Sequence, residues 1–200
     1  MSRVLLDPTA IGLSIRRIAA EIAERARERM ESPVLVAIRR GGSPFAKRIA
    51  THVEELVGDR PSVGAVDITL YRDDAATHLP SPRIGPSHIP VPVERRWIIL
   101  VDDVISTGRT IRAALDAVLD FGRPRRIELA VLVDRGGREL PIQPDYVGTS
   151  RPIPSEERVE VVMKRVGPLE GDEEPWALLV PPNPPSTPGG LPPARAKEAK

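Results

Sequence analysis

The sequence predicts an α/β domain built around a mainly parallel sheet that is flanked by helices. Three apolar runs, VLVAI at 34–38, WIILV at 97–101 and RIELAVLVD at 126–134, have the continuous hydrophobicity of strands buried on both faces. Segments with helical periodicity separate these runs. Because strands that alternate with helices are joined by right-handed crossovers, we expect the strands to run parallel, with helices covering both faces of the sheet. A chain of 200 residues can bury a sizeable core in such a domain.

The first half of the chain supplies two helices and two strands. Asp7-Pro8 reads as a helix cap followed by proline at the first helical position, and the apolar residues that follow recur at helical spacing, which predicts a helix over 8–30. After the strand at 34–38, Ser43-Pro44 predicts the cap of a second helix that reaches about residue 56. The stretch VGAVDITLY at 63–71 is β-branched and partly alternating, which predicts another strand.

The second half continues the alternation. A helix with one apolar face, from about 111 to 119, follows the strand at 97–101, and Gly122 with Pro124 ends it. Beyond the strand at 126–134, apolar runs at 159–162 and 176–180 could add edge strands to the sheet.

Two segments lack this regular patterning. Residues 72–94 contain five prolines and no sustained period, so they are either a lid or a disordered segment, and a lid is the favoured interpretation. Residues 181–200 are rich in proline and then charged, which predicts a disordered tail. The predicted domain therefore covers residues 1–180.

Composition excludes several classes of protein. The net charge of +1 argues against a polycation that coats nucleic acid unspecifically. The absence of cysteine excludes disulfides, zinc–thiolate sites and thiol nucleophiles. The sequence has neither a long apolar run nor a signal-peptide pattern, so we expect a cytoplasmic protein. The three histidines have no metal-ligand spacing.

The stretch IILVDDVISTGRT at 98–110 is the strongest functional signal. Thr107 to Thr110 would offer backbone N–H groups and hydroxyls at a helix N-terminus, where a phosphate is favoured. Asp102 and Asp103 cannot bind a phosphate, but they could accept hydrogen bonds from vicinal hydroxyls or hold a divalent cation. A ribose with a 5-phosphate satisfies both halves of the stretch. The alternative is an ordinary strand-to-helix turn with an aspartate cap, for which one aspartate would suffice.

This stretch resembles the phosphoribosyl pyrophosphate (PRPP) signature of the type I phosphoribosyltransferases. Three further blocks, DITLYRDD at 67–74, TGRTIRAALDAVLDFGRPRRIELAVLVDRG at 107–136 and RELPIQPDYVG at 138–148, are similar to the PyrR family of bifunctional pyrimidine operon attenuation regulators and uracil phosphoribosyltransferases. The similarity runs from about Asp7 to Val166. It implies a type I phosphoribosyltransferase fold with a flexible lid.

The resemblance implies that the protein joins uracil to PRPP, giving UMP and pyrophosphate, with Mg2+ bound mainly through PRPP rather than by direct protein ligation. It assigns catalytic roles to Asp102, Asp103, Arg39 and Arg40, and places Arg72, Asp73 and Asp74 at the lid. The implied PRPP and nucleotide contacts are Arg40, Gly41, Asp102, Asp103, Val104, Ile105, Ser106, Thr107, Gly108, Arg109, Thr110, Arg135 and Val159.

The turn that should meet the pyrophosphate departs from the family pattern. Family members usually read I-x-T-R-G here, whereas AIRRGGSP at 37–44 aligns Arg40 with the threonine and Gly41 with the arginine. The cation is thus displaced by one position. Arg39 or Arg40 could still reach a phosphate; alternatively, both are solvated arginines before a turn.

The family's second activity is UMP-dependent binding of the leader mRNA of the pyrimidine operon, which attenuates transcription. Phosphate contacts require a basic face, for which the candidates are Arg16 and Arg17, with further arginines at 25, 29, 123, 125 and 126. Glutamates alternate with the arginines of the first helix, so a merely solvated face is the alternative. Gly137 also replaces a histidine that relatives carry.

Two hypotheses from different classes follow. The first is a uracil phosphoribosyltransferase that also regulates its operon, and the second is a non-catalytic, nucleotide-sensing RNA-binding regulator. A phosphoribosyltransferase for another base is a further alternative, because the residues alone do not fix the base. By resemblance the chain is a homo-oligomer, either a dimer or a tetramer, with PRPP, uracil, UMP and leader mRNA as partners and no membrane.

Overall fold

Five parallel strands form the central sheet, in the order β3-β2-β4-β5-β6. The computed structural model describes residues 2–39, 41–71, 85–154, 156–165 and 173–181. The strands are β2 (Val34–Ile38), β3 (Ser62–Val66), β4 (Trp97–Ile105), β5 (Arg126–Asp134) and β6 (Tyr146–Ser150). The prediction of an α/β fold with a mainly parallel sheet is therefore confirmed.

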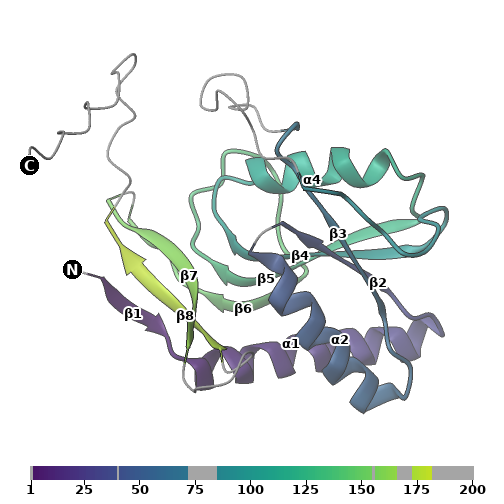
Figure 1. Ribbon diagram of the computed structural model, residues 1–200, viewed down its shortest axis with the longest axis horizontal. Helices are drawn as coiled ribbons and strands as arrows, with labels where there is room; N and C mark the ends of the chain where they lie inside the picture. Colours follow the sequence, from purple (N-terminus) through teal and green to yellow (C-terminus); the bar gives the residue numbers. More distant parts are fainter. Residues whose placement is uncertain (1, 40, 72–84, 155, 166–172, 182–200) are drawn as a thin grey trace, which may run out of the picture.

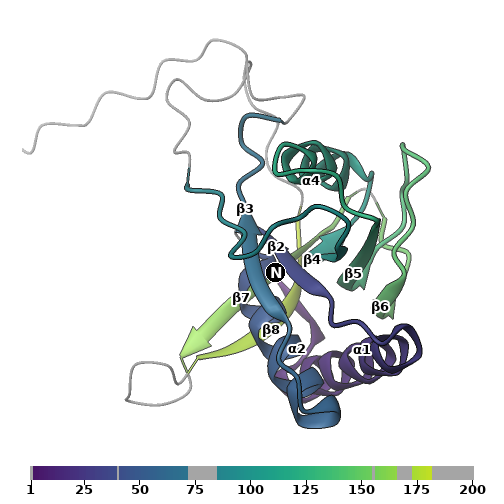
Figure 2. The ribbon, with the colours of Figure 1, turned by 90° about the vertical axis from the view of Figure 1, so that its right-hand side faces the viewer.

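Helices cover both faces of this sheet (Figures 1 and 2). Helices α1 (Pro8–Arg29) and α2 (Gly42–Val57) pack on one face, and α4 (Arg109–Leu119) packs on the other. Alternate residues of each strand serve the two faces, since side chains of a strand point to opposite sides. In β4, for example, Ile99 packs with α1 and α2, whereas Leu100 packs with α4. This double burial explains why the strand sequences are continuously apolar.

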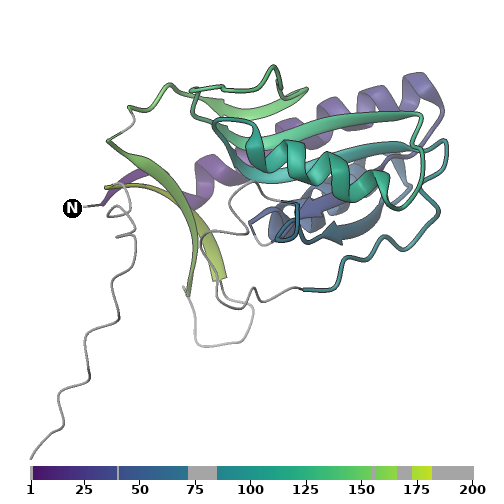
Figure 3. The same cartoon turned by 90° about the horizontal axis from the view of Figure 1, so that it is seen from above.

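A second, antiparallel sheet lies beside the carboxyl ends of the main strands (Figures 1 and 3). It contains β1 (Arg3–Leu6), β8 (Glu173–Val180) and β7 (Arg158–Arg165), in that order. The runs at 159–162 and 176–180 are therefore strands, but the prediction that they extend the main sheet is wrong. They pair with each other and with the N-terminal residues, and Ala177 is buried against the core beneath α1.

Several element boundaries differ from the sequence prediction. Strand β3 ends at Val66 rather than 71, because the Asp67 carboxylate accepts a hydrogen bond from Thr69 N at 2.8 Å and closes a turn. Helix α2 begins at Gly42 without a side-chain cap, so the predicted Ser43 cap is wrong. Strand β4 continues past residue 101 to Ile105. The helix at 8–30 and the strands at 34–38 and 126–134 are confirmed.

Only the C-terminal part of the predicted lid, residues 85–94, falls within the described residues. Residues 72–84 lie outside the described residues, as do residues 182–200 of the predicted tail. Within 85–94, His88 pairs with Ala65 of the edge strand β3, and Ile89 and Val93 are buried in the core. This part belongs to the packed domain because its apolar side chains supply core contacts below α4.

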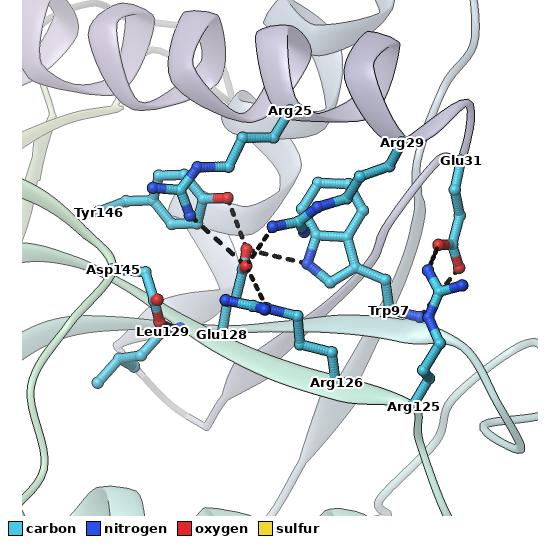
Figure 4. Close-up of polar contacts among 10 residues, drawn as sticks. All are labelled: Arg25, Arg29, Glu31, Trp97, Arg125, Arg126, Glu128, Leu129, Asp145 and Tyr146. Atoms are coloured by element: carbon cyan, nitrogen blue, oxygen red, sulfur yellow. Dashed lines mark hydrogen bonds and ion pairs between the residues drawn. The ribbon is translucent and has the colours of Figure 1, made fainter.

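Glu128 fastens the C-terminal half of α1 to the main sheet (Figure 4). Its side chain is 1% exposed, and its carboxylate accepts hydrogen bonds from Trp97 Nε1 at 2.9 Å and from the Tyr146 hydroxyl at 2.7 Å. Three arginines surround it, with N–O distances of 3.5 Å for Arg25, 2.8 Å for Arg29 and 2.6 Å for Arg126. We call this group of residues the Glu128 hub.

Aromatic stacking completes the Glu128 hub. The Arg25 guanidinium lies 4.5 Å from the centre of the Tyr146 ring, and that of Arg29 lies 4.2 Å from the Trp97 ring. Trp97 is fully buried and packs in the core. Within the part of the chain described here, none of the helices has the length and apolar character needed to cross a membrane.

Candidate functional site

The two neighbouring aspartates, Asp102 and Asp103, lie within strand β4 near its carboxyl end, rather than beyond that end. Asp102 pairs in register with Val131 of β5, and Val104 pairs with Val133. Asp102 is 5% exposed, and Asp103 is half-buried. The prediction that this strand ends at residue 101 is therefore wrong, because β5 is long enough for β4 to continue to Ile105.

Neither carboxylate is neutralised by a cation among the described residues. Asp102 Oδ1 accepts a hydrogen bond from Asp103 N at 3.0 Å, and Asp103 Oδ1 accepts one from Val104 N at 2.9 Å. Burial raises the pKa of Asp102 well above its usual range, and the neighbouring Asp103 charge raises it further. Burial also raises the pKa of Asp103, although hydrogen bonds oppose the shift. A pair of this kind favours a ligand that donates hydrogen bonds or carries positive charge.

The turn after β4 leaves the N-terminus of α4 open. Gly108 occupies the N-cap position with φ +90°, a conformation that other residues rarely adopt, and no side chain caps the helix. Arg109 N points to Thr107 Oγ1 at 3.3 Å. Arg109 N already donates to this hydroxyl, and the N–H groups that follow it in the first turn of α4 have no partner within the helix, so the turn offers the donors predicted for a phosphate. Asp102 and Asp103 are thus brought next to this turn by one continuous strand.

A segment that the sequence analysis did not assign to the site holds this turn in place. The Arg138 side chain, 15% exposed, donates to Ser106 O at 2.9 Å and to Ile142 O at 2.8 Å, and forms an ion pair with Asp134 at 2.7 Å. The backbone N–H groups of 139 and 140 donate to Thr107 O. The block RELPIQ was visible in the sequence, but no local pattern shows that its arginine turns back to residue 106.

Arg109 and Arg135 occupy different surroundings. The Arg109 side chain is exposed and forms an ion pair with Glu139 at 2.6 Å. Arg135 N donates to Ile105 O at 3.1 Å, and its guanidinium donates to Pro154 O at 3.1 Å, which ties β4 and β5 to the chain leading into β7. Val159, one of the nucleotide contacts that the resemblance implies, is in β7, and its side chain packs against the core.

The turn after β2 packs directly on the aspartates. A Cβ atom at Gly41 would lie 2.4 Å from Asp103 Oδ2, so only glycine fits at this position with Asp103 in its present place. The Gly42 backbone is similarly close to Val101 O, where a Cβ would lie at 2.0 Å. Arg40 lies outside the described residues. The Asp103 carboxylate therefore lies next to the position from which an arginine side chain would start in the family pattern.

Arg39 is directed toward the base of the predicted lid. Its Nη1 atom lies 3.6 Å from the position that a Cβ atom would take at Gly85. The positive charge of Arg39 also helps to lower the pKa of Asp67. Burial would raise the pKa of Asp67, but hydrogen bonds from Thr69 and Gly85 and the Arg39 charge together lower it. Asp67 thus joins the two ends of the segment that contains Arg72, Asp73 and Asp74, which themselves lie outside the described residues.

The two arginines proposed for RNA binding on α1 differ in their freedom. Arg17 donates to Gly148 O and pairs with Glu21, so it helps to pack α1 on β6. Arg16 is exposed and lines a shallow cavity of about 490 Å3 between the N-terminal turns of α1 and the small sheet, together with Glu174 and Trp176. The residues that the structure describes include no group of three or more potential metal ligands.

Comparisons with known proteins identify the family. The model of the phosphoribosyl transferase domain matches residues 4–164. Proteins named bifunctional protein PyrR are 50% identical over 162 residues in Thermoanaerobacter sp. (81% of this chain and 90% of that protein). The figures are 51% over 162 residues in Roseiflexus sp. (81% and 88%) and 49% over 160 residues in Bacillus cereus (79% and 88%).

Solved structures agree on the fold. The hypoxanthine phosphoribosyltransferase of Trypanosoma cruzi superposes with a TM-score of 0.64 at 16% identity, covering 90% of this chain and 97% of that one. A hypoxanthine-guanine phosphoribosyltransferase of Bacillus anthracis gives a TM-score of 0.59 at 20% identity, covering 75% and 84%. At these identities the likeness concerns the fold alone, and it confirms the type I phosphoribosyltransferase architecture.

Proposed function

This chain belongs to the phosphoribosyl transferase domain family and, within it, to the group of proteins named bifunctional protein PyrR, and we propose that it transfers the phosphoribosyl group of PRPP to uracil and regulates the pyrimidine operon. One observation carries the enzymatic half of the proposal. One buried and one half-buried carboxylate, without a cationic partner among the described residues, lead directly into an open helix N-terminus. These two features match the hydroxyls and the 5-phosphate of one ribose phosphate.

Each part of the turn has a distinct task in binding. Asp102 and Asp103 accept hydrogen bonds from the ribose hydroxyls, and the Ser106 and Thr107 hydroxyls with the first N–H groups of α4 bind the 5-phosphate. Residues Val104, Ile105, Gly108, Arg109 and Thr110 complete this cradle. Arg138 keeps the cradle in shape because its guanidinium donates a hydrogen bond to the carbonyl of Ser106.

The reaction displaces pyrophosphate from the anomeric carbon, through a transition state with positive charge on the sugar ring. The protein's contribution is to hold the ring in place, to surround that charge with fixed carboxylates and to exclude water. Mg2+, when bound with PRPP, neutralises charge on the departing pyrophosphate. Carboxylates whose pKa is raised by burial fit this arrangement, because a nearby cation would stabilise their ionised forms.

Arg39 and Arg40 are the cations closest in sequence to the pyrophosphate turn. Gly41 stands where relatives carry an arginine and has no side chain to offer, so the pyrophosphate depends more on Mg2+ and on these two flanking arginines. Arg72, Asp73 and Asp74 belong to the lid that closes over bound PRPP. Arg135 and the backbone near Val159 lie on the side from which the base enters.

The regulatory half of the proposal is UMP-dependent binding to leader mRNA of the pyrimidine operon, followed by transcription attenuation. The relatives at 48–51% identity that share the name support this half. A cytoplasmic location follows from it, since operon transcripts are made there. We further propose a homodimer or homotetramer, which sedimentation velocity on the full chain would test.

Turnover of PRPP and Mg2+ with uracil, hypoxanthine or orotate tests the enzymatic half. We expect pyrophosphate release with uracil alone. Release with another base would reassign the substrate. Tight UMP binding without release of pyrophosphate would instead support the second candidate, a nucleotide-sensing regulator, for which the altered turn at Gly41 is the specific argument.

A further inference from the structure

A groove lies between the first half of α1 and the beginning of β8 (Figure 1). Its volume is about 490 Å3. Its α1 side is a stripe of residues at helical spacing, which therefore share one side of the helix: Thr9, Gly12, Leu13 and Arg16. Glu174 and Trp176 of β8 form the other side. We call this feature the α1–β8 groove, and its described lining shares no residue with the PRPP turn.

The α1–β8 groove presents apolar surface that the described part of the chain leaves uncovered. Leu13 is 61% exposed, and Trp176 is only partly buried. The Lys164 ammonium group lies 4.5 Å from the centre of the Trp176 ring and covers one face of it. The Trp176 Nε1 atom has no acceptor among the described residues, although a shielded indole N–H usually finds one. The groove is therefore incomplete as a packed surface.

Gly12 makes the α1 side of the groove flat. A Cβ atom at this position would meet no atom of the described residues within 4 Å, so packing inside the domain does not require glycine here. Glycine in the interior of a helix is destabilising relative to alanine, because it loses more conformational freedom on folding. A glycine in this setting is explained when the backbone of another segment approaches the helix closely.

Residues 182–200, which lie outside the described residues, have the composition of a segment that suits such a groove. They read PNPPSTPGGLPPARAKEAK, in which Leu191, Pro192 and Pro193 form an apolar block. Proline-rich sequences favour the polyproline II conformation and dock on grooves lined by aromatic residues. The entropic cost of such docking is low, because proline already fixes φ. A sequence with too few apolar residues for a core of its own can still bury this block against Leu13 and Trp176.

The charges of the two surfaces are complementary. Asp7 and Glu174 belong to the groove lining and are exposed. Glu174 forms no hydrogen bond or ion pair with the residues that the structure describes. Arg195 and Lys197 follow the apolar block within four positions, so they would lie next to these carboxylates when the block is docked.

Strand β8 brings the proline-rich segment within reach of the groove. The strand ends at Val180, four positions after Trp176, which corresponds to about 13 Å of extended chain. Residues 181–190 span up to about 31 Å in the polyproline II conformation. Pro188-Gly189-Gly190 is a turn-forming sequence that allows the chain to reverse its direction. Residues 191–197 can therefore return alongside β8.

We propose that residues 191–197 dock in the α1–β8 groove of the same chain. The apolar block packs against Leu13 and Trp176, its backbone approaches Gly12, and the basic residues that follow lie beside Glu174. The inference concerns a surface apart from the PRPP turn, so it stands or falls independently of phosphoribosyl transfer.

Disulfide trapping in the full chain tests the docking, since the protein contains no cysteine of its own. The test protein carries Thr9→Cys and Ala194→Cys, and a disulfide requires the two Cα atoms to come within about 7 Å. The control protein carries Glu160→Cys and Ala194→Cys. Glu160 is exposed and pairs with Leu178, so it lies nearer to the start of the proline-rich segment. We expect the test pair to oxidise on the order of tenfold faster than the control pair, because docking raises the local concentration of residue 194.

A third protein adds Gly12→Met to the test pair and fills the groove. We expect trapping to slow to the control rate, and a cooperative thermal transition in each protein verifies that it is folded. Equal rates for the test and control pairs, or a rate that Gly12→Met leaves unchanged, overturn the proposal. Disulfides between two chains, seen as a product of twice the mass, overturn docking within one chain and assign the groove to the segment of a second copy.

Discussion

Glu128 and the Asp102–Asp103 pair are two buried acidic sites at opposite ends of neighbouring strands, and their surroundings contrast. The Glu128 carboxylate has three arginines, an indole N–H and a tyrosine hydroxyl around it. Burial alone would raise the pKa of Glu128, but hydrogen bonds from Arg29 and Tyr146, the Arg29 charge and the Trp97 bond lower it to about 2. The same hub raises the pKa of Tyr146, through burial and its bond to Glu128.

The aspartates interact with backbone N–H groups and with each other, no cation neutralises them in the described structure, and burial raises the pKa of both carboxyl groups. The comparison teaches how the same side-chain chemistry serves stability at one end of the sheet and binding at the other. A carboxylate whose oxygens already accept hydrogen bonds from internal donors, as in Glu128, has no free acceptor with which to bind a ligand. Carboxylates left uncompensated reduce stability until a ligand supplies donors or positive charge.

Of the changes that test this comparison, Glu128→Gln should have the largest effect. We expect it to lower the free energy of unfolding. Removing one partner of a buried ion pair costs about 3–5 kcal/mol, because the arginines are left without their counter-ion. Urea unfolding would measure the loss. Glu160→Gln, which breaks an exposed pair with Arg158, is the control and should cost less than about 1 kcal/mol. A Glu128→Gln loss as small as the control would mean that the hub does not stabilise the fold.

Asp102→Asn with Asp103→Asn should show the reverse pattern. We expect uracil turnover to fall about 100- to 1,000-fold, since both fixed carboxylates that meet the ribose and its developing charge are lost. The free energy of unfolding at pH 7 should not fall and should rise, because no internal ion pair is broken and the unfavourable burial of charge is removed. Asp59→Asn, at an exposed position, is the control for both measurements. Unchanged PRPP affinity in the double variant would contradict the ribose role.

The contrast also explains what could be predicted from the sequence. The aspartate pair and the phosphate turn are contiguous, so IILVDDVISTGRT predicts their chemistry and place together. The Glu128 hub draws on α1, the start of β4, β5 and β6, and no local pattern relates Arg29 to Trp97 or Tyr146. The small sheet was missed as a unit for the same reason, since four residues at the N-terminus pair with a strand near residue 178.

The register of β4 and the position of Arg138 show a second limit of sequence patterns. Two adjacent aspartates indicate the end of a strand, but pairing with β5 carries the strand on to Ile105. Arg138 reaches Ser106 O from a segment that has no periodic pattern. Tertiary hydrogen bonds decide both features, and they depend on residues about 30 positions apart.

Acid pH should affect the two sites in opposite directions. Glu128 has a lower pKa in the folded protein than its ordinary 4.5, so its stabilisation is complete above that value and is lost as the pH falls toward about 2. Asp102 and Asp103 have raised pKa values in the folded protein, so the unfavourable burial of their charge is relieved as the pH falls.

Unfolding free energies measured from pH 7 down to pH 3 would test this contrast. The difference between wild type and Glu128→Gln should shrink on acidification. Any stability that the double Asp→Asn variant gains at pH 7 should shrink as well, because the wild-type aspartates become protonated. A difference for Glu128→Gln that grows as the pH falls would show that its carboxylate is not held ionised by the arginines.

The smallest effects should come from single arginines of the Glu128 hub, and their order tests why the hub is stable. Arg126 is 54% exposed, so we expect Arg126→Gln to cost about 0.5–1 kcal/mol. Arg29 is 25% exposed and stacks on Trp97, so Arg29→Gln should cost about 2 kcal/mol. Urea unfolding of both variants, with Arg151→Gln as an exposed control, would measure these losses. Equal costs for Arg29 and Arg126 would indicate that charge alone stabilises Glu128, whereas the expected order assigns the difference to burial and stacking.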